Sequence, residues 1–134
     1  SNLVSWARDV YKRQDLKGEP FMVTFWTTWS PESVDQIKIL DDYINDSSLD
    51  QKNSKIRMLL VNNQENQKVV SNFVKRGGYD VEVLLDESGE AGNNYGIKTL
   101  PTTFFVGSDG SIKEIFVGTM NRSMLVDKIE NLLK

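Results

Sequence analysis

The feature that most constrains the fold is a regular alternation of short β-type segments with longer segments of helical periodicity, which begins at Phe21. Phe21–Trp26 (FMVTFW) is rich in β-branched and aromatic residues and follows the helix breakers Gly18 and Pro20, a pattern that predicts a buried strand. Residues 56–61 and 81–85 have the same character, and a helical segment separates each strand from the next. Strands that alternate with helices in this way predict a parallel sheet.

The segment after the first strand carries the signals of a helix start. Ser30 is a good N-cap, Pro31 suits the first helical position, and Glu32 places an acid in the first turn. Apolar residues then recur every three or four positions: Val34, Ile37, Leu40 and Ile44. We expect this helix to run to about Asp46, with a polar loop over residues 47–54.

The remaining segments complete the pattern. A second helix ends at Gly77-Gly78, and residues 88–95 predict a short helix. Thr102–Val106 and Ile112–Val117 flank the turn sequence Ser-Asp-Gly at residues 108–110, which predicts a hairpin, and a last helix starts near Asn121. The apolar stripes are Val69, Val70, Phe73 and Val74 in the second helix and Met124, Leu125, Ile129, Leu132 and Leu133 in the last.

The order β-α-β-α-β-α-β-β-α predicts an α/β fold, a three-layer α/β/α sandwich around a mixed sheet with a C-terminal antiparallel hairpin. With 134 residues, we expect one domain over residues 1–134. Residues 1–14 are a lead-in in which residues 4–13, including Trp6, fit a helix or an edge strand equally well, and Ser1-Asn2 is expected to be a tag remnant. Residues expected in the core are Trp26, Met58, Met120 and Met124, whereas Lys68, Lys75 and Arg76 are expected on the solvated face of the second helix.

Charge and composition exclude several classes of function. The formal net charge is −3 and the sequence pI is about 5.0, whereas nucleic-acid binding needs a concentrated basic face. The chain contains neither histidine nor cysteine, which excludes His-paired nucleophiles, thiolate chemistry and zinc–thiolate sites. We therefore expect no metal, no cofactor and no nucleic-acid partner. No apolar run approaches the roughly 20 residues of a membrane helix, so membrane contact is expected only through an N-terminal anchor outside this sequence.

Three segments resemble the ResA/TlpA group of thiol–disulfide oxidoreductases. Residues 15–18 (DLKG) and 21–29 are similar to the lead-in and the F-W-x-T-W strand of that group. Residues 100–105 (LPTTFF) match its L-P-T-T-F segment, whose proline is cis, and residues 118–120 (GTM) resemble the segment before its last helix. The likeness covers residues 15 to 134 and includes the β-α insertion of the group, here at residues 63–86.

The resemblance implies a thioredoxin-like, extracytoplasmic and membrane-tethered reductase of disulfides, often in cytochrome c maturation. The C-x-P-C or C-P-P-C motif of the group is replaced here by Ser30-Pro31-Glu32-Ser33. By this resemblance, Ser30 occupies the position of the attacking cysteine and Ser33 that of the resolving cysteine. A serine hydroxyl stays protonated at neutral pH unless a base activates it, and the chain has no histidine for that purpose. We therefore expect the chain to be redox-inactive as written.

Two origins of the serines stay open. They are either substitutions made in an active oxidoreductase, or the result of natural loss of both cysteines. The carboxylate that active ResA-like proteins carry three residues beyond the second cysteine, where it serves proton transfer, is replaced here by Gln36. The buried acid of plain thioredoxin is likewise replaced by Thr24. A deliberate trap would leave the acid in place, so Gln36 favours natural loss. A peroxidase-like activity fails on the same missing sulfur.

The leading hypothesis is therefore a binding module for a protein or an extended peptide. By resemblance, the peptide adds as a strand to the backbone beside the former redox motif, and Trp29, either half-buried packing or an aromatic anchor, is expected to be partly exposed there. A purely structural explanation accounts for two of the residues there equally well: Ser30 is an N-cap and Pro31 occupies the first helical position. The residues expected to form this cleft are Trp29, Ser30, Pro31, Thr99, Leu100 and Pro101.

Overall fold

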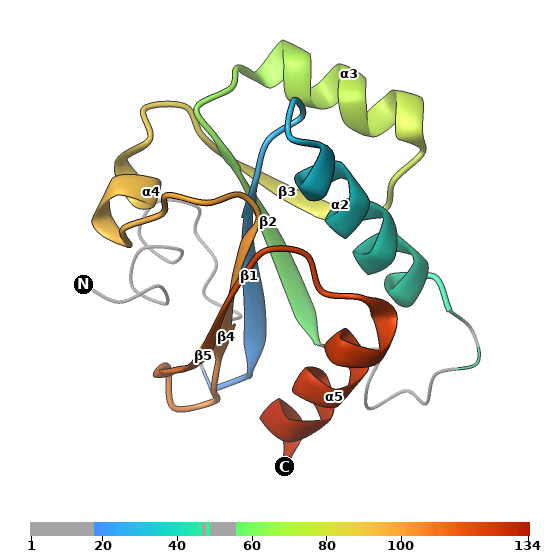
Figure 1. Ribbon diagram of the computed structural model, residues 1–134, viewed down its shortest axis with the longest axis vertical. Coiled ribbons are helices and arrows are strands. Elements are labelled where there is room, and N and C mark those ends of the chain that lie inside the picture. Colours follow the sequence, from blue (N-terminus) through green and yellow to red (C-terminus); the bar gives the residue numbers. More distant parts are fainter. Residues whose placement is uncertain (1–17, 47, 49–55) are drawn as a thin grey trace.

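The computed structural model describes residues 18–46, 48 and 56–134, which form one mixed sheet and its covering helices (Figure 1). Residues 1–17, which include Trp6 and the lead-in of the ResA/TlpA resemblance, lie outside the described residues. In chain order the elements are β1 (Phe21–Trp26), α2 (Pro31–Ile44), β2 (Arg57–Asn63), α3 (Gln67–Gly77), β3 (Glu82–Asp86), α4 (Glu90–Asn94), β4 (Thr102–Val106), β5 (Ile112–Val117) and α5 (Arg122–Leu133).

The sheet has the strand order β3-β2-β1-β4-β5, with β1 at its centre. β1 and β2 are parallel, as are β2 and β3, whereas β4 runs antiparallel to both β1 and β5. All six residues of β1 are buried, because helices cover both faces of the sheet. This burial explains why FMVTFW lacks the polar alternation of a half-exposed strand.

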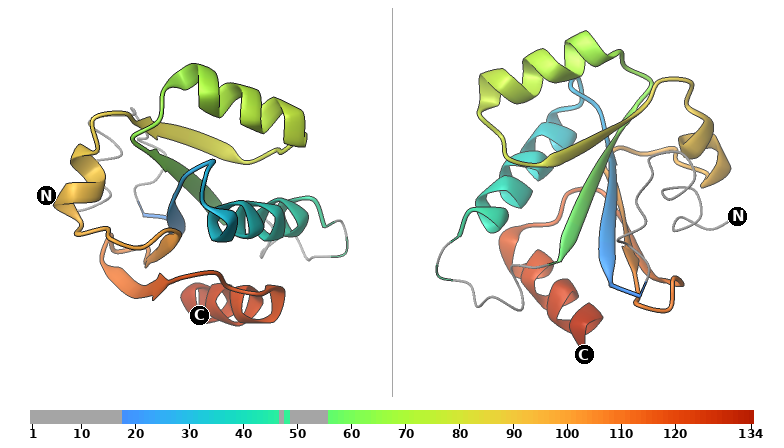
Figure 2. Two further views of the ribbon diagram at one scale, coloured as in Figure 1. Left: turned by 45° about the horizontal axis from the view of Figure 1, so that its top comes forward. Right: turned by 180° about the vertical axis from the view of Figure 1, so that it is seen from behind.

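The two faces of the sheet carry separate apolar cores. Met22 and Trp26 of β1 belong to a core shared with α2, α3 and α5, while Phe21, Val23 and Phe25 belong to a core shared with α4. Figure 2 shows α2 and α5 on one side of the sheet and α4 on the other. Successive residues of a strand face opposite sides, so a single strand supplies both cores. The result is the expected three-layer arrangement.

The predicted elements agree with the structure apart from some strand and helix ends and two apolar positions on helices. α2 ends at Ile44 rather than near Asp46, and α4 is shorter than the predicted 88–95. β2 continues through Asn62 to Asn63, beyond the apolar run that predicted it. On α2, the expected core residue Ile44 is 36% exposed, and Tyr43 is buried instead. On α3, Val69 is 44% exposed because adjacent helical residues point about 100° apart, and Val70 is the one that faces the sheet.

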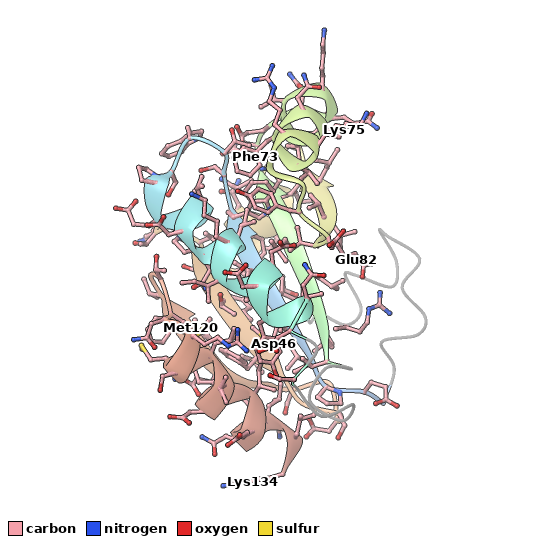
Figure 3. The ribbon with its side chains drawn as sticks, turned by 90° about the vertical axis from the view of Figure 1, so that its right-hand side faces the viewer. Asp46, Phe73, Lys75, Glu82, Met120 and Lys134 are labelled. Carbon is pink, nitrogen blue, oxygen red and sulfur yellow. The ribbon has the colours of Figure 1, made fainter. Side chains whose placement is uncertain are left out.

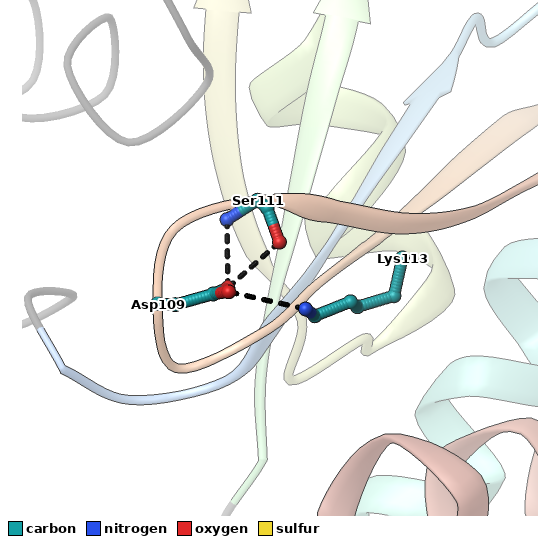
Figure 4. A network of polar contacts seen from close by, with 3 residues as sticks. All are labelled: Asp109, Ser111 and Lys113. Carbon is teal, nitrogen blue, oxygen red and sulfur yellow. Dashed lines mark hydrogen bonds and ion pairs between the residues drawn. The ribbon is translucent and has the colours of Figure 1, made fainter.

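A polar network closes the β4–β5 hairpin (Figure 4). Asp109 Oδ1 accepts hydrogen bonds from the backbone N–H of Ser111, at 3.0 Å, and from its hydroxyl, at 2.7 Å. Lys113 Nζ lies 3.1 Å from Asp109 Oδ2. The hydrogen bonds from Ser111, followed by those from Lys113, lower the pKa of Asp109 to about 2. Gly110 adopts a φ of 84°, which an L side chain rarely takes, and so supplies the backbone conformation of the predicted turn.

Candidate functional site

The connection from β1 to α2 and the first turn of α2 hold residues 30–33, which the ResA/TlpA resemblance places at the position of the redox motif. Ser30 has an extended backbone and is the N-cap of α2, where its Oγ accepts a hydrogen bond from the backbone N–H of Ser33 at 3.2 Å. Pro31 occupies the first helical turn, where it loses no hydrogen bond, and Glu32 is the acid of that turn. The local roles expected of Ser30 and Pro31 are thus confirmed.

The two serine hydroxyls are poorly suited to nucleophilic chemistry. Ser30 is 4% exposed, and its oxygen is occupied by the cap hydrogen bond. Ser33 is fully buried, and its hydroxyl has no hydrogen-bond partner among the described residues. The chain contains no histidine or cysteine, and a hydroxyl needs an adjacent base to attack at neutral pH.

Gln36, at the position of the family acid, makes a two-point hydrogen bond to the backbone. Its Nε2 donates to the carbonyl oxygen of Met120 at 3.2 Å, and its Oε1 accepts from the N–H of Met120 at 2.7 Å. Gln36 is fully buried, and so is Met120. An amide fits this place because it supplies one donor and one acceptor, whereas a carboxylate supplies acceptors only. The sequence alone marks Gln36 only as the replacement of an acid and does not predict this structural role.

Thr24 also makes a buried pair. Its Oγ1 lies 2.9 Å from Oγ1 of Thr103, the residue directly opposite on β4. Both side chains are essentially unexposed. The hydroxyls satisfy each other, so the place where plain thioredoxin has an acid is occupied here by a neutral hydrogen-bonded pair.

Glu65 holds the loop that carries Trp29, a role that sequence analysis missed. One carboxylate oxygen accepts from the backbone N–H of Thr28 at 2.7 Å and from the amide of Asn62 at 2.8 Å. The other oxygen accepts from the hydroxyl of Thr28 at 2.5 Å. The carboxyl ends of the parallel strands β1 and β2 meet at one edge of the sheet. The run of polar residues that follows β2 was therefore the only sequence signal that a polar side chain could reach the loop after β1.

The segment before β4 leaves the sheet at this same edge. Phe25 of β1 pairs with Thr102 of β4, so the residues after β1 and those before β4 emerge side by side. The Leu100–Pro101 peptide bond is cis. The hydroxyl of Thr102 donates to the carbonyl of Thr99 at 2.6 Å, and the N–H of Gly118 donates to the carbonyl of Pro101 at 2.8 Å.

Two backbone groups at this edge stay available. Within residues 18–46, 48 and 56–134, neither the N–H nor the C=O of Leu100 takes part in a hydrogen bond. Trp29 is 71% exposed, the largest exposed fraction among the large apolar side chains described. The fold thus brings the expected residues to one end of the sheet, and we call this set the docking site, after the role proposed for it below: Trp29, Ser30, Pro31, Thr99, Leu100 and Pro101.

The arrangement is better suited to binding than to chemistry. It offers an aromatic surface at Trp29 and, at Leu100, a donor and an acceptor without partners among the described residues, where the hydroxyls of Ser30 and Ser33 likewise make no hydrogen bond to a basic side chain. An unpaired N–H and C=O at the end of a sheet are the groups that an extended peptide uses when it adds as a strand.

Comparison with known proteins gives a consistent result. Residues 8–133 match the family model described as Redoxin. The thiol-disulfide oxidoreductase ResA of Bacillus subtilis (strain 168) is 31% identical over 120 residues, which are 90% of this chain and 64% of that protein. The chain therefore spans a little under two thirds of the length of this relative.

Solved structures resemble the fold closely. StoA from Bacillus subtilis is 28% identical, with a TM-score of 0.66 over 83% of this chain and 82% of that one. The exposed lipoprotein thioredoxin of Streptococcus pneumoniae strain TIGR4 is 21% identical, with a TM-score of 0.73 over 88% of each chain. In the described part of this chain, no helix has both the length and the apolar content to cross a bilayer.

Proposed function

The chain belongs to the Redoxin family, and from that premise we propose that it is a redox-inactive, thioredoxin-like binding module of the ResA/StoA type that holds a protein or an extended peptide at the docking site. The observation that carries the proposal is that, among the described residues, the N–H and C=O of Leu100 have no hydrogen-bond partner, at the end of the sheet from which the exposed Trp29 also emerges. A peptide in extended conformation would pair with Leu100 and lay a side chain on Trp29.

The lack of redox activity follows from the chemistry of the motif. Ser33 can form no disulfide, and Ser30 uses its oxygen to cap α2. The buried pairs at Gln36 and Thr24 support natural loss of the activity, since both proton-handling positions are filled by neutral, hydrogen-bonded side chains. We expect no protein-dependent reduction of insulin by dithiothreitol above a blank without protein. A measurable protein-dependent rate would contradict this part of the proposal.

A peptide selected against the wild-type chain tests the binding role. Peptides of about 12 residues displayed on phage are selected on the wild-type protein and counter-selected on the Trp29→Ala variant. The peptides recovered should shift the backbone amide signals of Leu100 and Trp29 in the ¹H–¹⁵N spectrum. Methylating the peptide nitrogen that pairs with Leu100 should weaken binding about fivefold or more, because it removes one hydrogen bond and adds a clash. Binding that is indifferent both to that methyl group and to Trp29→Ala would refute the docking site.

One observation favours a second candidate, an active thiol–disulfide oxidoreductase seen with serine in place of cysteine. The hydroxyl of Ser33 is buried without a hydrogen-bond partner among the described residues, which suits a thiol better because a thiol loses less on desolvation. The codons for positions 30 and 33 in the genome decide between the two. Cysteine codons at these positions would show that the natural protein carries the redox motif, and the oxidoreductase would then replace the binding module as the proposed function.

We also place the protein outside the cytoplasm by analogy. The Streptococcus pneumoniae relative is described as an exposed lipoprotein. Cell fractionation with antibodies against this chain tests the assignment, and a purely cytoplasmic signal would overturn it.

A further inference from the structure

Next to the docking site, on the side of α3, the surface is hollowed by a second groove. It has a volume of about 490 Å³. Thr28, which immediately precedes Trp29, lines it together with five residues of α3. We call it the α3 groove, and its lining comprises Thr28, Val69, Asn72, Phe73, Arg76, Gly77 and Tyr79.

The floor of the α3 groove is aromatic and rests on the core. The ring of Phe73 lies 5.5 Å from that of the buried Trp26, and 5.7 Å from that of Tyr79. Phe73 lies on the side of α3 that faces α2 (Figure 3). A Cβ on Gly77 would lie 2.0 Å from the Tyr79 ring, so the glycine at the end of α3 lets this ring complete the floor. The exposed Val69 adds an apolar wall.

The charge of α3 is opposite to that of the chain as a whole. The helix carries Lys68, Lys75 and Arg76 and no acidic residue, whereas the whole chain has a net charge of −3. Across residues 18–46, 48 and 56–134, none of these three cations forms an ion pair. Arg76 lines the groove itself, and Lys68 lies two turns before it on the same row of the helix. The groove therefore offers the charge of Arg76, without an ion pair in the described part of the chain, beside an apolar floor.

The groove is held in a fixed relation to the docking site. Glu65 accepts hydrogen bonds from both the N–H and the hydroxyl of Thr28, so this lining residue is held in place, and Trp29 follows it directly in the chain. A peptide that crosses Trp29 toward α3 meets the groove next.

We propose that the α3 groove is a second subsite for the partner and that it selects an acidic segment, in which an aromatic or branched apolar side chain sits on Phe73 and Tyr79 while a neighbouring carboxylate pairs with Arg76. This inference rests on the proposed binding function, whose partner chemistry it specifies. A peptide is favoured over an anionic membrane surface because the groove is concave and carries the side-chain amide of Asn72, which can both donate to and accept from the backbone of an extended chain.

Two matched peptides provide the test. The acidic probe is a peptide recovered by selection on the docking site, extended by Asp-Phe-Glu at the end that points toward α3, and the neutral probe carries Asn-Phe-Gln instead. The acidic probe should bind the wild-type protein about threefold or more tightly than the neutral one, as expected for one solvent-accessible ion pair. Raising the salt from about 0.05 to 0.5 M should remove most of this difference.

Variants of α3 locate the effect. Arg76→Gln should abolish the preference for the acidic probe, whereas Lys75→Gln removes the same charge from the same helix outside the groove and should leave it unchanged. Val69→Thr, a substitution of similar shape at an exposed position, should weaken both probes. If Lys75→Gln reduces the preference as much as Arg76→Gln, the helix acts only through its overall charge and the subsite is refuted.

The remaining outcomes separate this inference from the function on which it rests. Equal affinity for both probes, with binding still lost in Trp29→Ala, overturns the α3 subsite and leaves the docking site intact. No binding of either probe refutes both proposals together. A third outcome is that the protein sediments with phosphatidylglycerol vesicles in a manner that depends on Arg76, while it shows no preference between the two probes. This result would assign the groove to a lipid surface and overturn the proposal that it binds a peptide.

Discussion

The buried amide of Gln36 yields the sharpest test of how this site differs from an active one. Gln36→Glu restores the type of side chain that active ResA-like proteins carry at this position. An ionised carboxylate would still accept from the N–H of Met120, but it would lose the donor and place a negative charge against the Met120 carbonyl oxygen. A protonated carboxyl keeps both interactions. Because the site is fully buried, we expect burial to raise the pKa of the new carboxyl above its ordinary value.

The magnitude follows from proton linkage. In the unfolded chain the carboxyl has a pKa near 4.3. Keeping it protonated in the folded protein costs about 1.4 kcal/mol for each pH unit by which the solution pH exceeds this unfolded pKa, which limits the cost at pH 7 to about 3.7 kcal/mol. The folded pKa lies above the unfolded one, so the variant is most stable relative to wild type below the unfolded pKa and loses stability as the pH rises toward the folded pKa. We expect a loss of about 2–4 kcal/mol at pH 7 and of less than about 1 kcal/mol at pH 4.

Urea unfolding followed by tryptophan fluorescence measures both values, with each variant compared with wild type at the same pH. Gln36→Met is the matched control, because it removes both hydrogen bonds and adds no titratable group, so its loss of stability should not depend on pH. A loss for Gln36→Glu that is equal at pH 4 and pH 7, or no loss at pH 7, would refute the pairing of Gln36 with Met120.

Three other sites give further predictions. Glu65→Ala should lower the free energy of unfolding by about 2–3 kcal/mol, because three hydrogen bonds from Thr28 and Asn62 end on its carboxylate; a loss below about 0.5 kcal/mol in urea would contradict this. In a Ser30→Cys/Ser33→Cys variant, the thiol at position 30 should have a pKa below the free value of about 8.5, because the first N–H groups of α2 favour a thiolate. The rate of alkylation as a function of pH measures this pKa, and an unshifted pKa would show that the helix start does not act on this position. Asp109→Asn should destabilise the protein above about pH 4, and the difference should disappear as the pH falls toward 2, because the pKa of Asp109 is lowered from 3.8 to about 2 by Ser111 and Lys113. Thermal melts from pH 2 to 7 check this, and a difference independent of pH would refute it.

Local signals in the sequence predicted most of the elements and the start of α2. β1, β4 and β5 have the expected bounds, and Ser30 and Pro31 have the expected capping roles, because strand propensity, turn chemistry and helix capping depend on neighbours in the chain. The two misplaced apolar residues, Ile44 and Val69, lie at the margins of their stripes, where a small rotation of the helix decides which side chain is buried.

Contacts across long stretches of sequence decided the rest of the site. Gln36 and Met120 are 84 residues apart, Thr24 and Thr103 are 79 apart, and Thr28 and Glu65 are 37 apart. Glutamine, threonine and glutamate are all common on exposed surfaces, so their residue types alone do not predict burial or a partner. The α3 groove depends on the same kind of placement, since the loop after β1 and the face of α3 meet only in the folded chain.

The sequence by itself determined that this chain has no thiol or imidazole, alternates strand and helix, and begins α2 at a serine cap, because composition and local propensity do not depend on the fold. Only the tertiary structure decided that Gln36 and Thr24 each have a neutral hydrogen-bond partner and that Glu65 accepts hydrogen bonds from the loop carrying Trp29. It also decided that the backbone of Leu100 has no hydrogen-bond partner among the described residues. The physical reason is that burial and hydrogen-bond partnership are properties of the space around a side chain, and that space is filled by residues distant in the sequence.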